Sequence, residues 1–92
     1  MHIFRTAAFK RCFRKLDKQR QERVIQSIGK LLDAIKNKSF TVGLGLKQLR
    51  LDLWEIRAGL LDRVVFCRKD NLIELLIVGT HDEIVRFLKQ CN

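Results

Sequence analysis

The chain has 92 residues, 47% hydrophobic and 32% charged, which excludes an intrinsically disordered chain and is typical of one globular domain over residues 1–92. We expect no membrane span and no secretory signal, because no apolar run approaches roughly 18 residues and the start of the chain has no uninterrupted apolar stretch. Nineteen Lys and Arg against ten Asp and Glu give a net charge of +9, which favours a polyanionic partner.

Two helices are predicted in the N-terminal half, after a short strand over residues 2–5. From Ala8 on, helical spacing relates the apolar residues Phe9, Cys12, Phe13 and Leu16, and Asp17 suits the N-cap of a second helix. The apolar stripe of that second helix consists of Val24, Ile25, Ile28, Leu31, Leu32 and Ile35. Two apolar stripes with cationic outer faces predict an antiparallel helical hairpin.

The C-terminal half is predicted to form a sheet and a short helix. A loop over residues 37–45 leads to strands over residues 51–58, 63–68 and 72–78, and the last of these is apolar on both faces, as inner strands are. Thr80 and Glu83 then match a capping box. The order of elements indicates an α+β fold, with an N-terminal helical hairpin packed on one face of a small antiparallel sheet, a short C-terminal helix and a free second face.

The positive charge is concentrated in the helices. Residues 1–50 contain thirteen basic and three acidic residues, whereas residues 51–92 contain six and seven. This asymmetry predicts that a nucleic acid or an acidic protein binds the N-terminal half, although a helix surface kept soluble by lysine has the same composition.

The cysteines and large aromatic residues are predicted to be structural. Three cysteines without C-x-x-C spacing favour a reducing cytoplasm over a disulfide framework. Cys12 and Cys67 fit small core positions, and Trp54 and Phe66 fit the core better than a base-stacking platform. We therefore expect no metal site and no cofactor.

The segment LWEIRAGLLDRVVFCR, residues 53–68, is the most informative part of the sequence. Alternation along the strands places Glu55 and Arg57 on one face of the first strand and Arg63 on one face of the second. A hairpin can bring both arginines onto one surface with the carboxylate beside them. Two guanidinium groups at a fixed spacing suit the binding of a phosphate.

These segments, in this order, resemble the RelE/ParE superfamily of toxins from type II toxin–antitoxin pairs. The resemblance covers nearly the whole chain and is carried by the basic helices, GLKQLR, LWEIRAG, DRVVF and LLIVGTHDEIVRFLK. It implies a RelE/ParE-like fold. It also implies either a RelE-like ribonuclease that cuts mRNA in the ribosomal A site or a ParE-like inhibitor of DNA gyrase. Members of both branches bind an acidic antitoxin, which is expected to set the oligomeric state.

The resemblance to the RelE-like branch implies a metal-free ribonuclease site on the sheet. Arg57 and Arg63 match the two arginines of the central hairpin and would hold the scissile phosphate, and Lys47, before the first sheet strand, would add positive charge. Glu55 and His81 match an acid–base pair of related cutters, and an imidazole can accept or donate a proton near neutral pH. The expected contacts with the ribosomal RNA backbone are the helix cations Lys10, Arg11, Arg14, Lys15, Lys18, Arg20 and Arg23.

Two departures from RelE leave alternatives open. The chain has no tyrosine, whereas RelE uses one near its C-terminus, and Leu53 and Glu55 stand where RelE places lysines. A gyrase inhibitor or a degenerate member that only binds its antitoxin therefore remains an alternative. Arg57 could also be a surface partner of Glu55 or Asp62, and the helix cations could be a solvated face.

Overall fold

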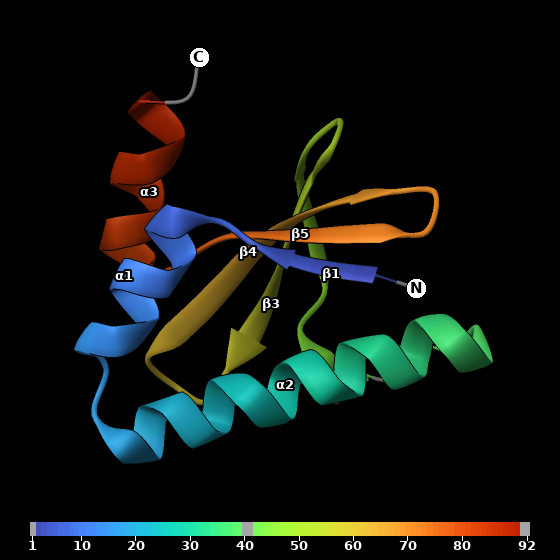
Figure 1. Cartoon of the computed structure of the whole chain (residues 1–92), viewed down its shortest axis with the longest axis horizontal. Coiled ribbons are helices and arrows are strands. Elements are labelled where there is room, and N and C mark those ends of the chain that lie inside the picture. The colour runs from blue at the N-terminus through green and yellow to red at the C-terminus, as the bar shows by residue number, and fades with distance from the viewer. Residues whose placement is uncertain (1, 40–41, 91–92) are drawn as a thin grey trace.

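The computed structural model describes residues 2–39 and 42–90. In this part of the chain it has a five-stranded sheet and three α-helices (Figure 1). In chain order the elements are β1 (His2–Arg5), α1 (Ala7–Lys15), α2 (Lys18–Asn37), a 3₁₀ turn (Val42–Leu44), β2 (Lys47–Arg50), β3 (Leu53–Ala58), β4 (Asp62–Lys69), β5 (Leu72–Thr80) and α3 (His81–Gln90). None of the described helices is long and apolar enough to cross a membrane.

Local side-chain hydrogen bonds set where the first two helices begin. The Thr6 hydroxyl accepts a hydrogen bond from the Phe9 N–H at 3.1 Å, and the Asp17 carboxylate accepts one from the Arg20 N–H at 2.9 Å. Both satisfy backbone donors that a helix start leaves open. The predicted Asp17 cap is confirmed. The predicted strand over residues 2–5 is confirmed as β1, whereas the arrangement of α1 and α2 as an N-terminal helical hairpin is not confirmed.

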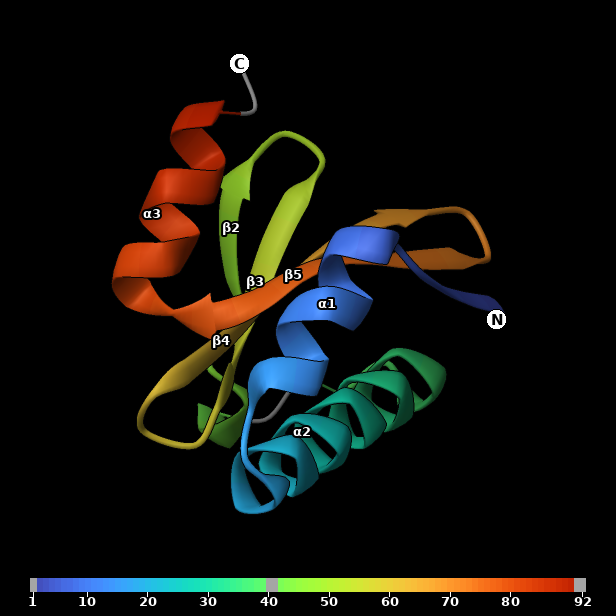
Figure 2. The same ribbon diagram turned by 60° about the vertical axis from the view of Figure 1, so that its left-hand side comes forward.

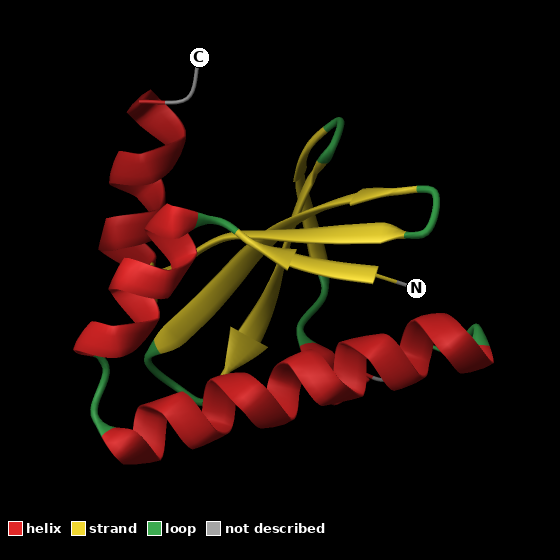
Figure 3. Ribbon diagram, viewed as in Figure 1, coloured by secondary structure: helices red, strands yellow, loops and turns green. Residues whose placement is uncertain are grey.

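The sheet is mixed, so the prediction of an antiparallel sheet was wrong. The strand order is β1-β5-β4-β3-β2, and β1 runs parallel to β5 while the other neighbours are antiparallel (Figure 3). The direction of β1 differs because no hairpin joins it to β5; α1, α2 and the other strands lie between them in the chain. The prediction that residues 72–78 form an inner strand is confirmed, because β5 has a neighbour on each side.

Strand β2 was missed by the sequence analysis. The predicted strand over residues 51–58 begins at Leu53, and residues 47–50, predicted to precede the sheet, form β2 instead. The segment KQLR has one half-buried apolar residue, Leu49, and therefore shows no apolar alternation. The predicted loop over residues 37–45 contains the 3₁₀ turn, and its residues 40–41 lie outside the described residues, as does Cys91.

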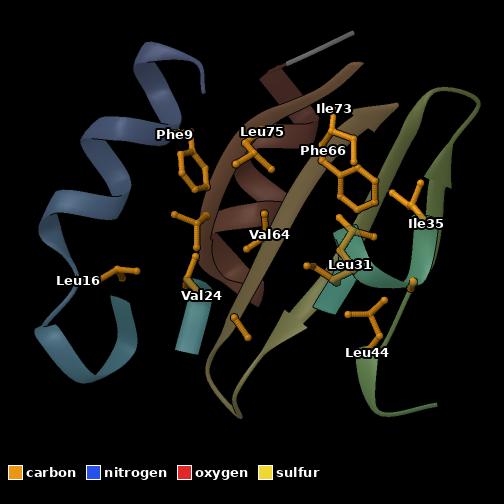
Figure 4. Packing of buried hydrophobic residues seen from close by; sticks show 14 residues of the cluster. Phe9, Leu16, Val24, Leu31, Ile35, Leu44, Val64, Phe66, Ile73 and Leu75 are labelled. Atoms are coloured by element: carbon orange, nitrogen blue, oxygen red, sulfur yellow. The ribbon is translucent and has the colours of Figure 1, made fainter. Parts of the chain in front are cut away.

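The main core lies between the sheet and helices α1 and α2. Figure 4 shows Phe9, Val24 and Leu31 of the helices meeting Val64 and Phe66 of β4, and all five are buried. Trp54 and Cys12 pack against this cluster, as predicted, and Cys67 is buried.

The second face of the sheet is not free, which corrects another prediction. Figure 2 shows the sheet between α3 on one side and α1 and α2 on the other. Val65 and Ile84 are almost fully buried outside the main core, at 0% and 3% exposure. Val65 alternates with Val64 and Phe66 along β4, so it faces away from α1 and α2. Helix α3 covers this part of the sheet because it has an apolar side of its own to bury.

Candidate active site

A hollow of about 620 Å³ lies on the α3 side of the sheet. All five residues predicted to be catalytic line it, although they come from β2, β3, β4 and the first turn of α3: Lys47, Glu55, Arg57, Arg63 and His81. Apolar side chains of α3, among them Ile84 and Leu88, form one wall. The structure thus brings together residues that are up to 34 positions apart in the sequence.

The strand register explains this convergence. Arg57 on β3 lies directly opposite Arg63 on β4, and Glu55 lies opposite Lys47 on β2 and Val65 on β4. Residues directly opposite in a sheet point to the same face. The prediction that the hairpin brings Arg57 and Arg63 onto one surface is confirmed. Lys47 reaches the hollow from within the sheet, on β2, and not from a segment before it.

The charged groups of the hollow are loosely paired. Arg63 Nε lies 3.7 Å from Glu55 Oε2, beyond good hydrogen-bond distance, and both side chains are partly exposed. Arg57 is exposed and has no hydrogen-bond or ion-pair partner among the residues that the structure describes. The alternative in which Arg57 pairs with Glu55 or Asp62 is therefore wrong, since those carboxylates pair with Arg63 and Arg20. One guanidinium group is left available for an anion.

Gly45 positions Arg57, and the sequence analysis missed this role. Gly45 has a left-handed φ of +64°, and a Cβ atom built on it would lie 2.9 Å from Cγ of Arg57. Only a residue without a side chain lets the Arg57 stem lie this close to the backbone. The sequence showed a glycine in a loop, but not which side chain crosses it.

Arg50 is a second residue that the sequence did not single out. Its Nη2 atom donates a hydrogen bond of 2.7 Å to the carbonyl oxygen of Leu88. The last carbonyl groups of a helix have no partner within the helix, and an arginine there is favourable. This bond joins β2 to the end of α3, and both elements contribute residues to the hollow.

His81 lines the hollow at the start of α3, where the predicted capping box is confirmed. The Thr80 N–H donates to Glu83 Oε1 at 2.8 Å, and the Glu83 N–H donates to the Thr80 hydroxyl at 3.4 Å. The hydrogen bond from the Thr80 N–H is the main cause that lowers the pKa of Glu83, and Arg86 and Arg20 add to it. Because α3 begins at His81, this cap fixes the backbone of the imidazole-bearing residue.

Arg20 has a structural partner, so its predicted role in RNA binding is not supported by its surroundings. Its Nε and Nη2 atoms donate to the two carboxylate oxygens of Asp62 at 2.8 and 2.6 Å, and Asp62 is only 1% exposed. The hydrogen bond with Asp62 raises the pKa of Arg20. Bidentate pairing uses the guanidinium edge that would otherwise meet a phosphate. The other predicted RNA contacts are exposed: Lys10, Arg11, Arg14, Lys15, Lys18 and Arg23.

An apolar groove of about 660 Å³ runs between β1, α1 and α2. Its lining includes the apolar residues Ile3 and Ile25 and the cations Arg5, Lys10 and Arg14. Ile25 was predicted to belong to the buried stripe of α2 but is 59% exposed. This groove therefore combines apolar side chains with cationic ones.

Solved structures, and not sequences, identify the fold. No protein-family model and no curated protein matches the sequence. A copper-bound mutant toxin from Helicobacter pylori superposes with a TM-score of 0.68 at 15% identity, over 91% of this chain and 98% of that one. YafQ from E. coli gives a TM-score of 0.66 at 11% identity, over 89% and 94%. RelE in the RelB–RelE antitoxin–toxin complex from Methanococcus jannaschii gives 0.68 at 14%, over 91% and 96%.

The chain has the RelE/ParE toxin fold. The predicted resemblance is thereby confirmed over nearly the whole chain at the level of structure. At these identities the RelE/ParE fold alone is shared, so what the hollow does is argued from this chain's own residues.

Proposed function

We propose that this chain is the toxin of a toxin–antitoxin pair and a ribosome-dependent endoribonuclease that cuts mRNA in the cytoplasm. The observation that carries the proposal is the pairing of Arg57 with Arg63 across β3 and β4, in one hollow with Glu55 and His81. A phosphate binds two guanidinium groups well, and a carboxylate and an imidazole beside them can transfer protons.

In the proposed reaction RNA supplies its own nucleophile. A proton leaves the 2′-hydroxyl for Glu55 or His81, and the 2′-oxygen bonds to the adjacent phosphorus. The bond from phosphorus to the 5′-oxygen breaks, and the other residue of the pair protonates the leaving oxygen. The products are a 2′,3′-cyclic phosphate and a 5′-hydroxyl. Arg57 and Arg63 stabilise the negative charge on the phosphorane, with Lys47 adding to the positive field. These steps need no metal ion.

The exposed helix cations support binding to the ribosome. These residues lie on α1 and α2 and do not line the hollow: Lys10, Arg11, Arg14, Lys15, Lys18 and Arg23. Neutralised phosphates release counterions, so binding through these residues weakens steeply as salt rises. Salt-independent association with ribosomes would contradict this part of the proposal.

The apolar groove supports an acidic antitoxin as the partner. A segment that carries both apolar residues and carboxylates would complement the groove, whose lining combines Ile3 and Ile25 with Arg5, Lys10 and Arg14. The solved RelB–RelE complex has the same fold on its toxin side and contains an antitoxin.

A purified translation system with a defined message tests the function. The expected result is a message cut at the A-site codon, with 5′-hydroxyl ends on the downstream fragments. A message with a single 2′-deoxynucleotide at the cut position should stay intact there, since its nucleophile is missing. Cleavage at the deoxynucleotide would contradict the 2′-hydroxyl mechanism.

The second candidate is a ParE-like gyrase inhibitor, favoured by the absence of tyrosine and by Leu53 and Glu55 in place of strand lysines. A supercoiling assay with purified gyrase separates the two. Lost supercoiling with intact message would support the inhibitor, whereas fragmented message with normal supercoiling would support the ribonuclease. Normal supercoiling and intact message, together with antitoxin binding, would indicate a degenerate member.

A further inference from the structure

A second cationic pocket adjoins the hollow. It has a volume of about 390 Å³ and lies between α2, the 3₁₀ turn and the turn that joins β3 to β4. Its cationic lining residues are Arg23, Lys30 and Arg57, and Arg57 also lines the hollow. The two cavities therefore meet at one guanidinium-bearing side chain.

The lining of this pocket suits an anion. Gln26 and Ser27 add hydrogen-bonding groups to the three cations, and no carboxylate is among the described residues that line it. Within the described parts of the chain, Arg23, Lys30 and Arg57 have neither an ion-pair nor a hydrogen-bond partner. Three cations gathered without an anion repel one another, and a bound phosphate would offset that repulsion.

Arg23 is positioned in the same way as Arg57. Gly59 has a left-handed φ of +79°, and a Cβ atom on it would lie 2.8 Å from Cδ of Arg23. The Gly59 backbone thus supports the stem of Arg23, as the Gly45 backbone supports that of Arg57. Both arginine stems lie against a turn glycine, which restricts where each guanidinium group can lie.

We propose that this pocket is a second phosphate subsite for single-stranded RNA. A strand whose scissile phosphate lies between Arg57 and Arg63 would continue across Arg57 and place a neighbouring phosphate against Arg23 and Lys30. The inference rests on the proposed function and names its substrate more closely, as RNA gripped at two or more phosphates.

Binding of fully 2′-O-methylated oligouridines tests the subsite without any cleavage. A dinucleotide with one phosphate and a tetranucleotide with three are compared by titration calorimetry at low salt. The wild-type chain should bind the tetranucleotide at least about tenfold more tightly. The double variant Arg23→Gln/Lys30→Gln should lose most of that gain, and its salt slope for the tetranucleotide should fall by about 1.4, or roughly 0.7 for each lost contact.

A matched control removes the same charge elsewhere. Lys36 and Lys89 are exposed and line neither cavity, so Lys36→Gln/Lys89→Gln should keep the gain. Arg23→Lys, which retains the charge, should keep part of the gain in tetranucleotide binding. A partial gain in this variant would indicate that the positive charge at residue 23, and not a loss of folding, determines the effect. Equal losses in the pocket variant and the control, or no gain in the wild-type chain, would overturn the proposal.

The binding and cleavage assays distinguish the subsite from the ribonuclease activity. A chain that leaves message intact but loses the tetranucleotide gain in Arg23→Gln/Lys30→Gln has the subsite without the ribonuclease. A chain that cuts message while the pocket variant binds like the control is a ribonuclease without this subsite.

Discussion

Two arginine–carboxylate pairs in this chain show opposite designs. Arg20 and Asp62 are joined by two hydrogen bonds of 2.8 and 2.6 Å, and the carboxylate is buried. Arg63 and Glu55 approach only to 3.7 Å in an open hollow beside Arg57, which has no partner among the described residues. The first pair satisfies its own charges and joins α2 to β4. The second leaves hydrogen-bonding capacity for a ligand.

Residue type alone does not separate a structural arginine from a functional one. Arg20 and Arg63 both lie near carboxylates, and both were predicted to bind RNA or its phosphate. What separates them is how many of their donors are already used, which depends on distance and burial.

The largest expected effect on stability comes from breaking the closed pair. Asp62→Ala leaves Arg20 without its partner, and Arg20→Gln leaves a buried carboxylate without its cation. Arg20→Gln, which leaves the charge buried, should lower the free energy of unfolding by about 3–5 kcal/mol, measured by urea denaturation. Asp62→Ala should lower it by less, because the cation that it leaves is partly exposed. Glu55→Gln in the open pair should change it by less than about 1 kcal/mol. Equal losses of stability from the two pairs would contradict the distinction between a structural pair and an open one.

Gly45→Ala should move Arg57 without changing any charge. The added methyl group would contact the Arg57 stem and would strain a left-handed backbone. We expect a loss of about 1–2 kcal/mol in stability and at least about a tenfold loss in message cleavage. Gly29→Ala is the control, because a Cβ atom there has no neighbour within 4 Å. Unchanged cleavage by Gly45→Ala would indicate that the position of Arg57 does not matter.

Thr80→Ala should weaken the cap of α3 beside the hollow. It removes the hydroxyl that accepts from the Glu83 N–H, and a lost N-cap typically costs about 1 kcal/mol. Thermal unfolding measures this loss. Thr80→Ser, which keeps the hydroxyl, should stay near wild type, and an equal loss in both variants would count against the capping role.

The smallest expected effect is a pH dependence from Glu83. Its pKa is lowered in the folded chain, so its contribution to stability is fully present above the unfolded value and is lost as the pH falls through the folded one. At neutral pH the free energy of unfolding of the wild type should exceed that of Glu83→Gln by about 0.3–1 kcal/mol. Urea midpoints at pH 7 and pH 3 should show this difference shrinking in acid, and a constant difference would contradict the assignment.

Much of the fold could be predicted because its signals are local. The Asp17 cap, the Thr80–Glu83 capping box and the uninterrupted apolar run of residues 64–67 each depend on neighbours in sequence. Strand β2 could not be predicted, since KQLR has no periodic pattern. The parallel pairing of β1 with β5 could not be predicted either, since strand direction depends on the path of the whole chain.

The site was predicted in part for the same reason. Arg57 and Arg63 are six residues apart in one hairpin, so alternation places them on one face. The partner of Arg20 is 42 residues away, and the contact of Gly45 with Arg57 depends on how a loop crosses β3. No local pattern in the sequence reports either contact.

The most direct test of the central claim is the rate of message cleavage by Arg57→Ala and Arg63→Ala in the purified translation system. The free energy of unfolding of each variant should lie within about 1 kcal/mol of the wild-type value, since neither substitution breaks a tight ion pair. Each should cut message about 10²–10³-fold more slowly, as expected when a donor to the developing charge is removed. Folded variants that cut at the wild-type rate would contradict the account.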